Sequence, residues 1–507
     1  MNYDWIKTRA QFDEEKAAVT DPLKGTEWTY QDLNIRAENL ANHLQEQGVQ
    51  RGDVVGIFAP NDVAVIDLLF ASFKIGAVYF PMNWRLKPNE IESVIEDSGV
   101  KMIFYANRHL SSLQGIADDY LHMDIDSPEY DELVHPRNHK PFKTADVDRD
   151  DLAALMYTSG TTGLPKGVMF TYESFTTNAV NTILTYKVNA GFSTVVSLPM
   201  FHVFGFNDLV IPLLMAGGSI VLHRYFEGEQ LNDLMAKYKP NYLSLIPTMY
   251  YAMLVAPNFN VKNFDNIDFL IQGGSAPLPG VQKKFASMGL NIINGYGLTE
   301  APLALINTPT NSLKKPMSIG KPVMYVESRL FDEDFNDVPI GEIGELAIKG
   351  KQVTPGYWNK KEATEESFHD GYFLTGDLAR LDEDGDIFIV DRRKELIITG
   401  GENVLPSEVE TVLSAHPLIA QCVVVGFESE KFGETVSAAV LLTENDPDFE
   451  EKLDKHMRES LASYKVPKMY LSVTKMPLTS TAKPDKLEVK KMMNRKAEQL
   501  KKKDDLA

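Results

Sequence analysis

The residues best suited to chemistry lie in one short run, Tyr157 to Val168, with the sequence Tyr-Thr-Ser-Gly-Thr-Thr-Gly-Leu-Pro-Lys-Gly-Val. Hydroxyl groups donate hydrogen bonds to anions, glycines let the backbone wrap closely around them, and a lysine adds a mobile positive charge. The residues of these three kinds are Thr158, Ser159, Gly160, Thr161, Thr162, Gly163 and Lys166. Their spacing differs from that of the common P-loop, in which a serine or threonine follows the lysine. The run therefore predicts a loop that binds a polyphosphate.

A second candidate segment, Asn294 to Glu300, has the sequence Asn-Gly-Tyr-Gly-Leu-Thr-Glu. Glycines on both sides of Tyr296 would let its ring lie flat against a planar base. Glu300 offers a carboxylate oxygen, the type of ligand that Mg²⁺ prefers, and Thr299 offers a donor to a phosphate. Taken alone, a Gly-Tyr-Gly sequence is more often an ordinary turn.

Three single residues stand out by type, although each also has a plainer interpretation. Asp377, in Thr-Gly-Asp, has two oxygens that suit the paired hydroxyls of a ribose, but this tripeptide is also a common turn. His202 lies among apolar residues, where a buried structural histidine is the usual finding. Lys483 lies near a basic C-terminal end, where most lysines are simply solvated. The histidines show no spacing typical of metal ligands, so Mg²⁺ is expected to arrive with a nucleotide.

The elements that must position these residues alternate between strand and helix in the first part of the chain. Thr29 and Asp32 form a capping-box pattern before an apolar helical stretch that ends near Gly48. Strands and helices are then expected at 54–59, 63–74, 78–80, 90–96 and 100–105, and the alternation returns between 194 and 271. Such alternation predicts parallel sheets covered by helices, an α/β fold.

The pattern of predicted strands and helices changes twice in the second half of the sequence. Short strands separated by Asp and Gly turns dominate residues 328–390 and predict a small antiparallel or barrel-like section. A charged cluster at 391–395 follows, and beyond it strands and helices mix as in an α+β domain. We therefore expect two domains, 1–391 and 392–507, because a chain of 507 residues is too long for one hydrophobic core.

Bulk composition excludes several classes of function. The chain has 51 basic and 71 acidic residues, a net charge of −20, which argues against general binding to nucleic acid or to anionic membranes. The apolar stretch from Leu209 to Leu222 is short for a membrane span and contains proline and glycine. A single cysteine excludes internal disulfides, and no secretory signal is evident, so a soluble protein of the cytoplasm is expected.

Taken together, these segments resemble the acyl-adenylate-forming superfamily, also called AMP-dependent synthetases and ligases. The likeness extends from about residue 25 to residue 490, and Pro-Met-Phe-His at 199–202 is similar to the acyl-CoA ligase branch, including fatty-acid–CoA and 4-coumarate–CoA ligases. Residues 477–483 resemble the family's catalytic-lysine motif, with Ala482 in place of the usual glycine. The resemblance implies a large N-terminal domain of two parallel-sheet α/β subdomains with a small β-barrel section, followed by a small mobile α+β C-terminal domain.

The resemblance also assigns roles to individual residues. It implies ATP, Mg²⁺ and coenzyme A as ligands, with Glu300 at the metal, Lys483, His202 and Thr299 in catalysis, and Lys394 at a hinge. Residues implied to contact the nucleotide or coenzyme A are Thr158, Ser159, Gly160, Thr161, Thr162, Gly163, Lys166, Gly274, Ser275, Ala276, Asn294, Gly295, Tyr296, Gly297, Thr299, Asp377, Arg392, Lys394, Gly400 and Gly401. A carboxylate would attack the α-phosphorus of ATP, and the thiol of coenzyme A would then attack the acyl-AMP.

The expected pocket for the acid carries no charged group that would bind a second carboxylate or an amine. Its residues are Phe206, Asn207, Gly273, Leu298 and Pro302. A neutral wall favours a hydrophobic fatty or aryl acid. Alternatives are a stand-alone acyl-AMP ligase that loads a carrier protein, and, from another class, a luciferase-like oxygenase or a non-catalytic acyl-nucleotide sensor.

Overall fold

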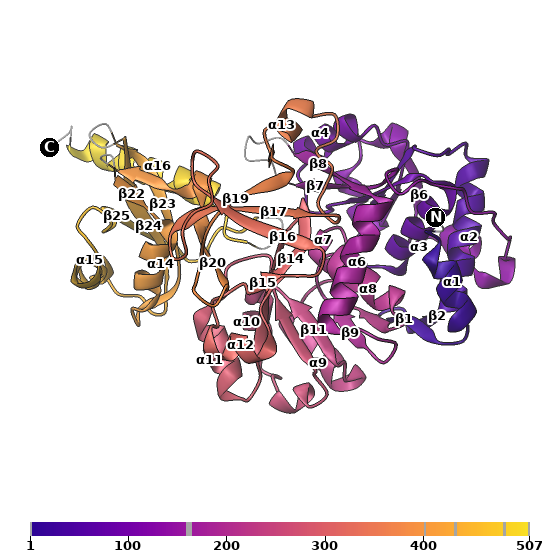
Figure 1. Cartoon of the computed structure of the whole chain (residues 1–507), viewed down its shortest axis with the longest axis horizontal. Coiled ribbons are helices and arrows are strands. Elements are labelled where there is room, and N and C mark those ends of the chain that lie inside the picture. The colour runs from indigo at the N-terminus through magenta and orange to yellow at the C-terminus, as the bar shows by residue number, and fades with distance from the viewer. Residues whose placement is uncertain (1–2, 159–164, 400–401, 430–432, 480–482, 505–507) are drawn as a thin grey trace. The chain divides into compact units, whose positions relative to one another are not determined.

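The computed structural model describes residues 3–158, 165–399, 402–429, 433–479 and 483–504 (Figure 1). The chain divides into two compact units. The first comprises Met1–Ser328 and Ala347–Thr375, and the second comprises Arg329–Leu346 and Gly376–Ala507. Among the residues described, no helix has the length and apolar character needed to cross a membrane.

A nine-stranded sheet forms the larger part of the first unit. Its order is β15-β14-β13-β12-β11-β9-β10-β1-β2, and the pairs from β13 to β1 are parallel, whereas the outer pairs are antiparallel. The strands are β1 Ala17–Asp21, β2 Thr26–Thr29, β9 Ser193–Val196, β10 Ser219–Leu222, β11 Tyr242–Leu245, β12 Phe269–Gln272, β13 Ile292–Leu298, β14 Ala301–Ile306 and β15 Lys321–Pro322. The carboxyl ends of β12 and β13 therefore meet at one edge, where the predicted segments at 273–276 and 294–300 lie.

A six-stranded sheet, in the order β6-β5-β3-β4-β7-β8, is parallel except for its last pair, β7 and β8. Its strands are β3 Val54–Phe58, β4 Val78–Met82, β5 Met102–Tyr105, β6 Leu121–Asp124, β7 Leu152–Thr158 and β8 Lys166–Thr171. Apolar residues of these strands form a core with α4, and Tyr157 and Trp358 pack against that core. This packing holds the C-terminal end of β7, directly before the predicted phosphate loop.

Helices cover these sheets, as the strand–helix alternation predicts (Figure 1). The capping box is confirmed at the start of α2, where Thr29 accepts from the Asp32 amide and Asp32 accepts from the Thr29 amide. The helices of the first unit are α1 Trp5–Phe12, α2 Tyr30–Glu46, α3 Val63–Ile75, α4 Pro88–Ser98, α5 Pro128–Val134, α6 Tyr172–Tyr186, α7 Val203–Gly205, α8 Ile211–Met215, α9 Gly228–Tyr238, α10 Pro247–Val255, α11 Pro279–Ser287, α12 Pro309–Lys314 and α13 Lys361–Glu365.

The predicted barrel-like section is a five-stranded sheet. Its order is β16-β17-β19-β18, with β20 paired to β19. The strands are β16 Val326–Phe331, β17 Ile343–Gly350, β18 Phe368–His369, β19 Tyr372–Leu381 and β20 Ile387–Arg392. The division between the two compact units falls within residues of this section, whereas the expected domain boundary after residue 391 stays a prediction.

The rest of the second unit is an α+β structure, as expected from the mixed pattern. A sheet in the order β22-β21-β24-β23, with β25 paired to β24, has helices on both faces. Alternation along β23 explains this, because Val424 packs with α14 and α15 while Val423 and Val425 pack with α16. The elements are β21 Ile397–Thr399, β22 Glu402–Val404, α14 Pro406–Ser414, β23 Ile419–Ser429, β24 Gly433–Leu442, α15 Phe449–Ser460, β25 Met469–Ser472 and α16 Lys486–Asp504. The predicted α/β fold class is confirmed.

Candidate active site

The two ends of the predicted phosphate loop are held together as a hairpin. Strands β7 and β8 are antiparallel, and Thr158 lies directly opposite Lys166. The residues between these ends that were predicted to bind phosphate, Ser159, Gly160, Thr161, Thr162 and Gly163, lie outside the described residues. The described part of the hairpin therefore places a lysine and a threonine side by side at the end of a buried sheet.

A segment from a distant part of the chain pairs with β8. We call Thr354–Trp358 the strap. The Met169 amide donates to the Gly356 carbonyl at 3.1 Å, and the Trp358 amide donates to the Gly167 carbonyl at 2.8 Å. Gly356 has a φ of 144°, and a Cβ atom there would lie 2.3 Å from the Thr364 side chain, so only glycine fits. The strap thus fixes the outgoing strand of the phosphate hairpin.

The strap also reaches the predicted metal ligand. The Tyr357 hydroxyl donates to Oε1 of Glu300 at 2.9 Å, and the Thr354 amide donates to the Glu300 carbonyl at 2.8 Å. The Lys166 ammonium lies over the Tyr357 ring, 4.7 Å from its centroid. One tyrosine therefore contacts both the carboxylate predicted to bind metal and the lysine predicted to bind phosphate. The sequence carries no signal that would single out Tyr357, because its partner Glu300 is 57 residues away.

Burial and the neighbouring Glu300 carboxylate both raise the pKa of Tyr357 far above that of a free phenol, while Ser367 opposes them. Burial is the largest of these causes, and the Tyr357 side chain is 8% exposed. Because the neutral phenol is the form that can donate a proton, this shift keeps the hydroxyl a donor to Glu300 at any ordinary pH.

The segment 294–300 runs along β13 into the turn before β14. The side chain of Asn294 is fully used inside the protein: its amide nitrogen donates to the carbonyls of Pro316 and Ser318, and its oxygen accepts from Gln272 and Gln282. Asn294 is 2% exposed, and its side chain supports the edge of the sheet. The predicted contact of Asn294 with the nucleotide would therefore have to use its backbone.

The remaining residues of this segment differ in their exposure. Gly295, Tyr296, Gly297 and Leu298 are half-buried, whereas Thr299 is 8% exposed. A Cβ atom at Gly297 would lie 2.7 Å from the backbone nitrogen of Leu303, which explains one of the two glycines beside Tyr296. The contact of Tyr296 with a planar base stays a prediction.

Gly273 and Gly274 follow β12 and face aromatic and aliphatic side chains. A Cβ atom at Gly273 would lie 3.3 Å from the Phe204 ring, and one at Gly274 would lie 3.5 Å from Ile246. Gly274 also has a φ of 76°, which side chains rarely tolerate. Ser275 and Ala276 follow as exposed residues. Phe204 and Ile246 are thus the described apolar neighbours of these glycines, and sequence reasoning did not identify either.

The other residues predicted for the acid pocket are more deeply buried. Phe206 is 0% exposed, and its ring packs against Tyr79 with a centroid distance of 5.6 Å. Asn207 is also 0% exposed, Pro302 is buried, and Leu298 is half-buried. Phe206 and Asn207 belong to the π-helical turn Phe206–Val210, whereas Leu298 ends β13 and Pro302 lies in β14.

His202 lies directly before α7 and acts as its cap. Its Nδ1 atom accepts from the Phe204 amide at 3.4 Å, and its side chain is half-buried. A Cβ atom at Gly205 would lie 2.4 Å from the Pro199 carbonyl oxygen, so glycine is required for the tight path around the histidine. His202 is therefore held in place by local structure, with its side chain partly open.

The second unit carries a separate group of charged residues. Asp377 and Arg392 lie directly opposite each other in the β19–β20 pair and form an ion pair of 2.6 Å. Asp377 is 6% exposed and Arg392 is 51% exposed. Burial and the neighbouring Arg392 lower the pKa of Lys483, and Asp377 partly offsets them. The sequence-predicted ribose pair and the predicted catalytic lysine are thus brought together.

Two hydrogen bonds join Thr479 and Lys483. The Lys483 amide donates to the Thr479 hydroxyl at 3.2 Å, and the Thr479 amide donates to the Lys483 carbonyl at 2.7 Å. Lys394 is exposed within the short 3₁₀ turn Arg393–Glu395. Gly400, Gly401 and Ala482 lie outside the described residues.

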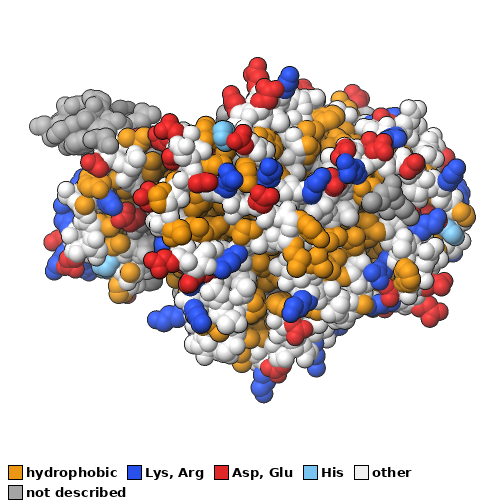
Figure 2. Space-filling view, in the orientation of Figure 1, with side chains coloured by type: hydrophobic (Ala, Val, Ile, Leu, Met, Phe, Trp, Pro, Cys, Tyr) orange, Lys and Arg blue, Asp and Glu red, His pale blue; other side chains and the backbone are white. Residues whose placement is uncertain are grey.

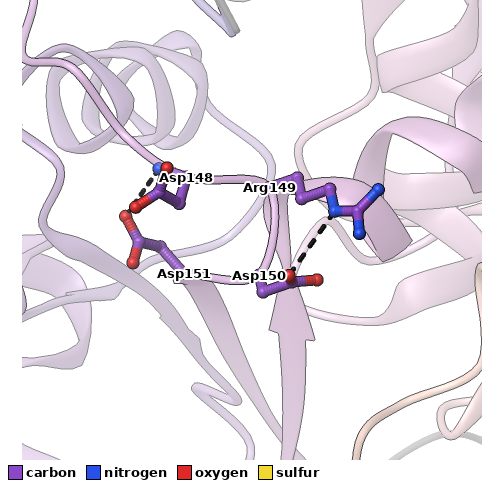
Figure 3. Close-up of a pocket in the computed structure, with 4 residues that line it drawn as sticks. All are labelled: Asp148, Arg149, Asp150 and Asp151. Carbon is purple, nitrogen blue, oxygen red and sulfur yellow. Dashed lines mark hydrogen bonds and ion pairs between the residues drawn. The ribbon is translucent and has the colours of Figure 1, made fainter.

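Two acidic surface features do not suit a nucleotide. Within the described part of the chain, one cluster of three possible metal ligands is found, Asp382, Asp384 and Asp386. Here Asp382 accepts from the amides of the other two, which closes the β19–β20 turn. Figure 3 shows a hollow lined by three carboxylates and Arg149, a charge balance that repels polyphosphate.

On the face drawn in Figure 2, acidic and basic side chains are interspersed, and no broad basic area is visible.

Comparison with known families gives one result over most of the chain. The sequence model of the AMP-binding enzyme family matches residues 6–358, and that of the AMP-binding enzyme C-terminal domain matches residues 408–483. A feruloyl-CoA synthase of Amycolatopsis sp. is 34% identical over 489 residues, covering 96% of this chain and 98% of that protein. A long-chain-fatty-acid–CoA ligase of Mycobacterium tuberculosis is 30% identical over 494 residues, covering 95% and 96%.

Solved structures agree with the sequence comparison. ATP-bound MatB from Rhodopseudomonas palustris superposes with a TM-score of 0.89 at 28% identity and covers 97% of this chain and 99% of its own. The o-succinylbenzoate–CoA synthetase of Bacillus subtilis, in complex with its acyl-adenylate, superposes with a TM-score of 0.83 at 27% identity and covers 95% and 96%.

Proposed function

We propose that this chain, which belongs to the AMP-binding enzyme family, uses Mg·ATP to join a hydrophobic aryl or fatty acid to coenzyme A. It is an acid–thiol ligase that uses ATP and coenzyme A, as are its relatives at 30% to 34% identity. The observation that carries the mechanism is the contact of Tyr357 with both Glu300 and Lys166 beside the phosphate hairpin. The alternative in which the acyl group passes to a carrier protein is not favoured by these relatives.

In the first step, an oxygen of the substrate carboxylate forms a bond to the α-phosphorus of ATP, and the bond from that phosphorus to the bridging oxygen breaks, releasing pyrophosphate. The Lys483 ammonium stabilises the negative charge that gathers on the reacting oxygens. Thr158, Lys166 and the loop between them are proposed to hold the phosphates, and Thr299 to donate to the α-phosphate. Asp377 and Arg392 are proposed to bind the ribose, and Tyr296 the adenine.

Glu300 is the proposed protein ligand for Mg²⁺. Its carboxylate fits that ion because it is a hard oxygen donor that a tyrosine hydroxyl orients through one of its two oxygens. When bound with ATP, the metal supplies charge neutralisation at the phosphates. The part played by this chain is to hold the carboxylate in place.

In the second step, the thiol sulfur of coenzyme A forms a bond to the acyl carbon, the bond to the AMP oxygen breaks, and the thiol proton passes to solvent. His202 is proposed to border the path of the thiol, and Gly400 and Gly401 to contact the pantetheine arm. We propose that a domain formed by residues 392–507 rotates about Lys394 relative to residues 1–391 between the two steps. Such a change needs only a few residues that absorb new dihedral angles.

The acid is proposed to lie beside Phe204 and the glycines that follow β12. Asn207 is fully buried, and neither of its amide atoms has a hydrogen-bond partner among the described residues. A hydroxyl group on an aryl acid would supply a partner, which removes the cost of a buried unpaired amide. This favours a hydroxylated aryl acid over a saturated fatty acid, although relatives of both kinds are known by name.

The test is mass spectrometry of products formed with Mg·ATP and a panel of fatty, aryl and succinylated acids, each with and without coenzyme A. The proposal requires an acyl-CoA product, with an aryl acid as the best substrate. Acyl-AMP that accumulates whether or not coenzyme A is present would instead identify carrier-protein delivery. Oxidised products formed under oxygen without a thiol would identify an oxygenase.

A further inference from the structure

Tyr357 lies between two opposite charges that the proposed reaction needs to keep apart. Its hydroxyl donates to Glu300 at 2.9 Å, and the face of its ring contacts the Lys166 ammonium at 4.7 Å. A carboxylate and an ammonium that meet directly form an ion pair, and each then loses affinity for an external ligand. The phenol gives each charge a partner without neutralising either one.

The backbone around Tyr357 allows the ring little freedom. The Tyr357 amide donates to the Thr364 hydroxyl at 2.9 Å, and the residues on both sides of it bind the carbonyl or amide groups of β8. The Thr354 hydroxyl donates to the Met169 carbonyl at 2.7 Å and so fixes the start of the strap. Glu300 is held from the same strap through its backbone. Lys166, Glu300 and Tyr357 therefore form one connected group within the first unit.

We propose that Tyr357 is a positioning residue that orients Glu300 for Mg²⁺ and separates it from Lys166, and thereby sets the affinity of the enzyme for Mg·ATP. The proposal rests on the metal role of Glu300 in the proposed function. The Tyr357 hydroxyl donates to Oε1 of Glu300, and a hydrogen bond of this kind orients a carboxylate that binds a metal ion. In this proposal Tyr357 acts through Glu300 and Lys166, the two site residues that it contacts.

The chain contains a matched control for this arrangement. Tyr372 donates its hydroxyl to Glu327 at 2.8 Å, and the Lys349 ammonium lies 5.1 Å from the centroid of its ring. Tyr372 is 5% exposed, close to the 8% of Tyr357, and all three residues of this second group belong to the first unit. The two tyrosines thus have the same chemistry, and only Tyr357 contacts predicted site residues.

The decisive experiment is calorimetric titration of ATP into the full-length protein, without acid or coenzyme A, once with Mg²⁺ and once with a chelator. Y357F removes the hydroxyl but keeps the ring under Lys166, so binding of Mg·ATP should weaken about tenfold, whereas metal-free ATP should bind as in the wild type. Y372F should change neither value. Equal weakening of both forms of ATP, or no weakening of Mg·ATP, would overturn the proposal.

A second readout separates positioning from a general structural defect. In E300Q, which has already lost the carboxylate charge, adding Y357F should weaken Mg·ATP binding far less than tenfold, because the two changes remove one interaction. If Y357F does not fold, 3-fluorotyrosine at position 357 keeps the shape and makes a stronger donor. It should then strengthen Mg·ATP binding without changing metal-free binding, and an unchanged Mg·ATP affinity would refute the proposal.

The outcome of these titrations can be told apart from a failure of the proposed function. If the wild type forms no acyl-AMP with any acid, the proposed reaction is wrong, while the comparison of Y357F with Y372F still decides whether Tyr357 sets the affinity for Mg·ATP.

Discussion

Opposite charges are arranged differently in the two units: a tyrosine contacts both of them in the first, and they pair directly in the second. In the first unit, Glu300 and Lys166 contact the same phenol, so their opposite charges are separated and each has a fixed partner. In the second unit, Arg392 pairs directly with Asp377, and Lys483 lies nearby, where burial and Arg392 lower its pKa. In the proposed function, the first arrangement holds a carboxylate for Mg²⁺, whereas the second places the Lys483 ammonium near an ion pair.

We therefore expect the two groups to act differently, one in metal binding and the other in stabilising a transition state. A carboxylate that must bind a metal ion benefits from being oriented, since the ion itself supplies the charge. A lysine that must stabilise a transition state benefits from partial desolvation, because its field is then stronger at the reacting atoms. Substitutions in the two groups should therefore have different signatures.

The largest effect is expected from Lys483→Ala. Loss of a fixed charge at the reacting oxygens should slow acyl-AMP formation by about 100- to 1000-fold, while thioester formation from supplied acyl-AMP is retained. Single-turnover assays of each step would measure this. Lys490→Ala is the matched control, because Lys490 is a lysine of the same unit that pairs with Glu434 instead. Equal loss of both steps in the Lys483 variant would contradict a role of Lys483 in the first step alone.

A smaller effect is expected from Asp377→Asn. Loss of a charged acceptor should raise the KM for ATP about tenfold. Asp377 also raises the pKa of Lys483, so its removal should lower that pKa further. Because Lys483 is proposed to act in its protonated form, acyl-AMP formation should be retained at low pH and lost as the pH rises through its pKa. The alkaline limb of the rate profile should therefore move to lower pH in the variant.

The control for that profile is Asp384→Asn, at the tip of the same β19–β20 hairpin. An alkaline limb that stays in place in Asp377→Asn would show that Lys483 does not respond to the ribose pair.

The most selective effect is expected from Gly273→Ala, because it alters shape without altering charge and should affect the larger acids only. A methyl group there would lie 3.0 Å from the Gly295 carbonyl oxygen and 3.3 Å from the Phe204 ring. It should lower kcat/KM for the bulkiest active acid by roughly tenfold and leave small acids nearly unaffected, with no change in pH profile. Competition assays with paired acids would measure the selectivity.

Gly280→Ala provides the comparison for Gly273→Ala, since no atom lies within 4 Å of a Cβ atom at that glycine. A uniform loss for all acids in Gly273→Ala would place the acid elsewhere in the first unit.

Much of this molecule was accessible from its sequence because the relevant signals are local. The capping box at Thr29 and Asp32 satisfies the first amides of a helix within one turn, so no distant contact is needed. Asp377 and Arg392 are joined by a single hairpin, which makes their pairing a short-range event. The family motifs likewise predicted the α/β fold and acid–thiol ligase class, which the comparisons confirm.

The rest was decided by tertiary structure, because it depends on which distant segments meet. Tyr357 reaches Glu300 only because the strap pairs with β8, a contact between segments far apart in the chain that leaves no local pattern. The Phe204 ring lies beside Gly273, a contact between residues 69 positions apart in the chain. Sequence thus determined the reactive groups and the elements that carry them, whereas long-range packing determined which neighbours hold each group in place.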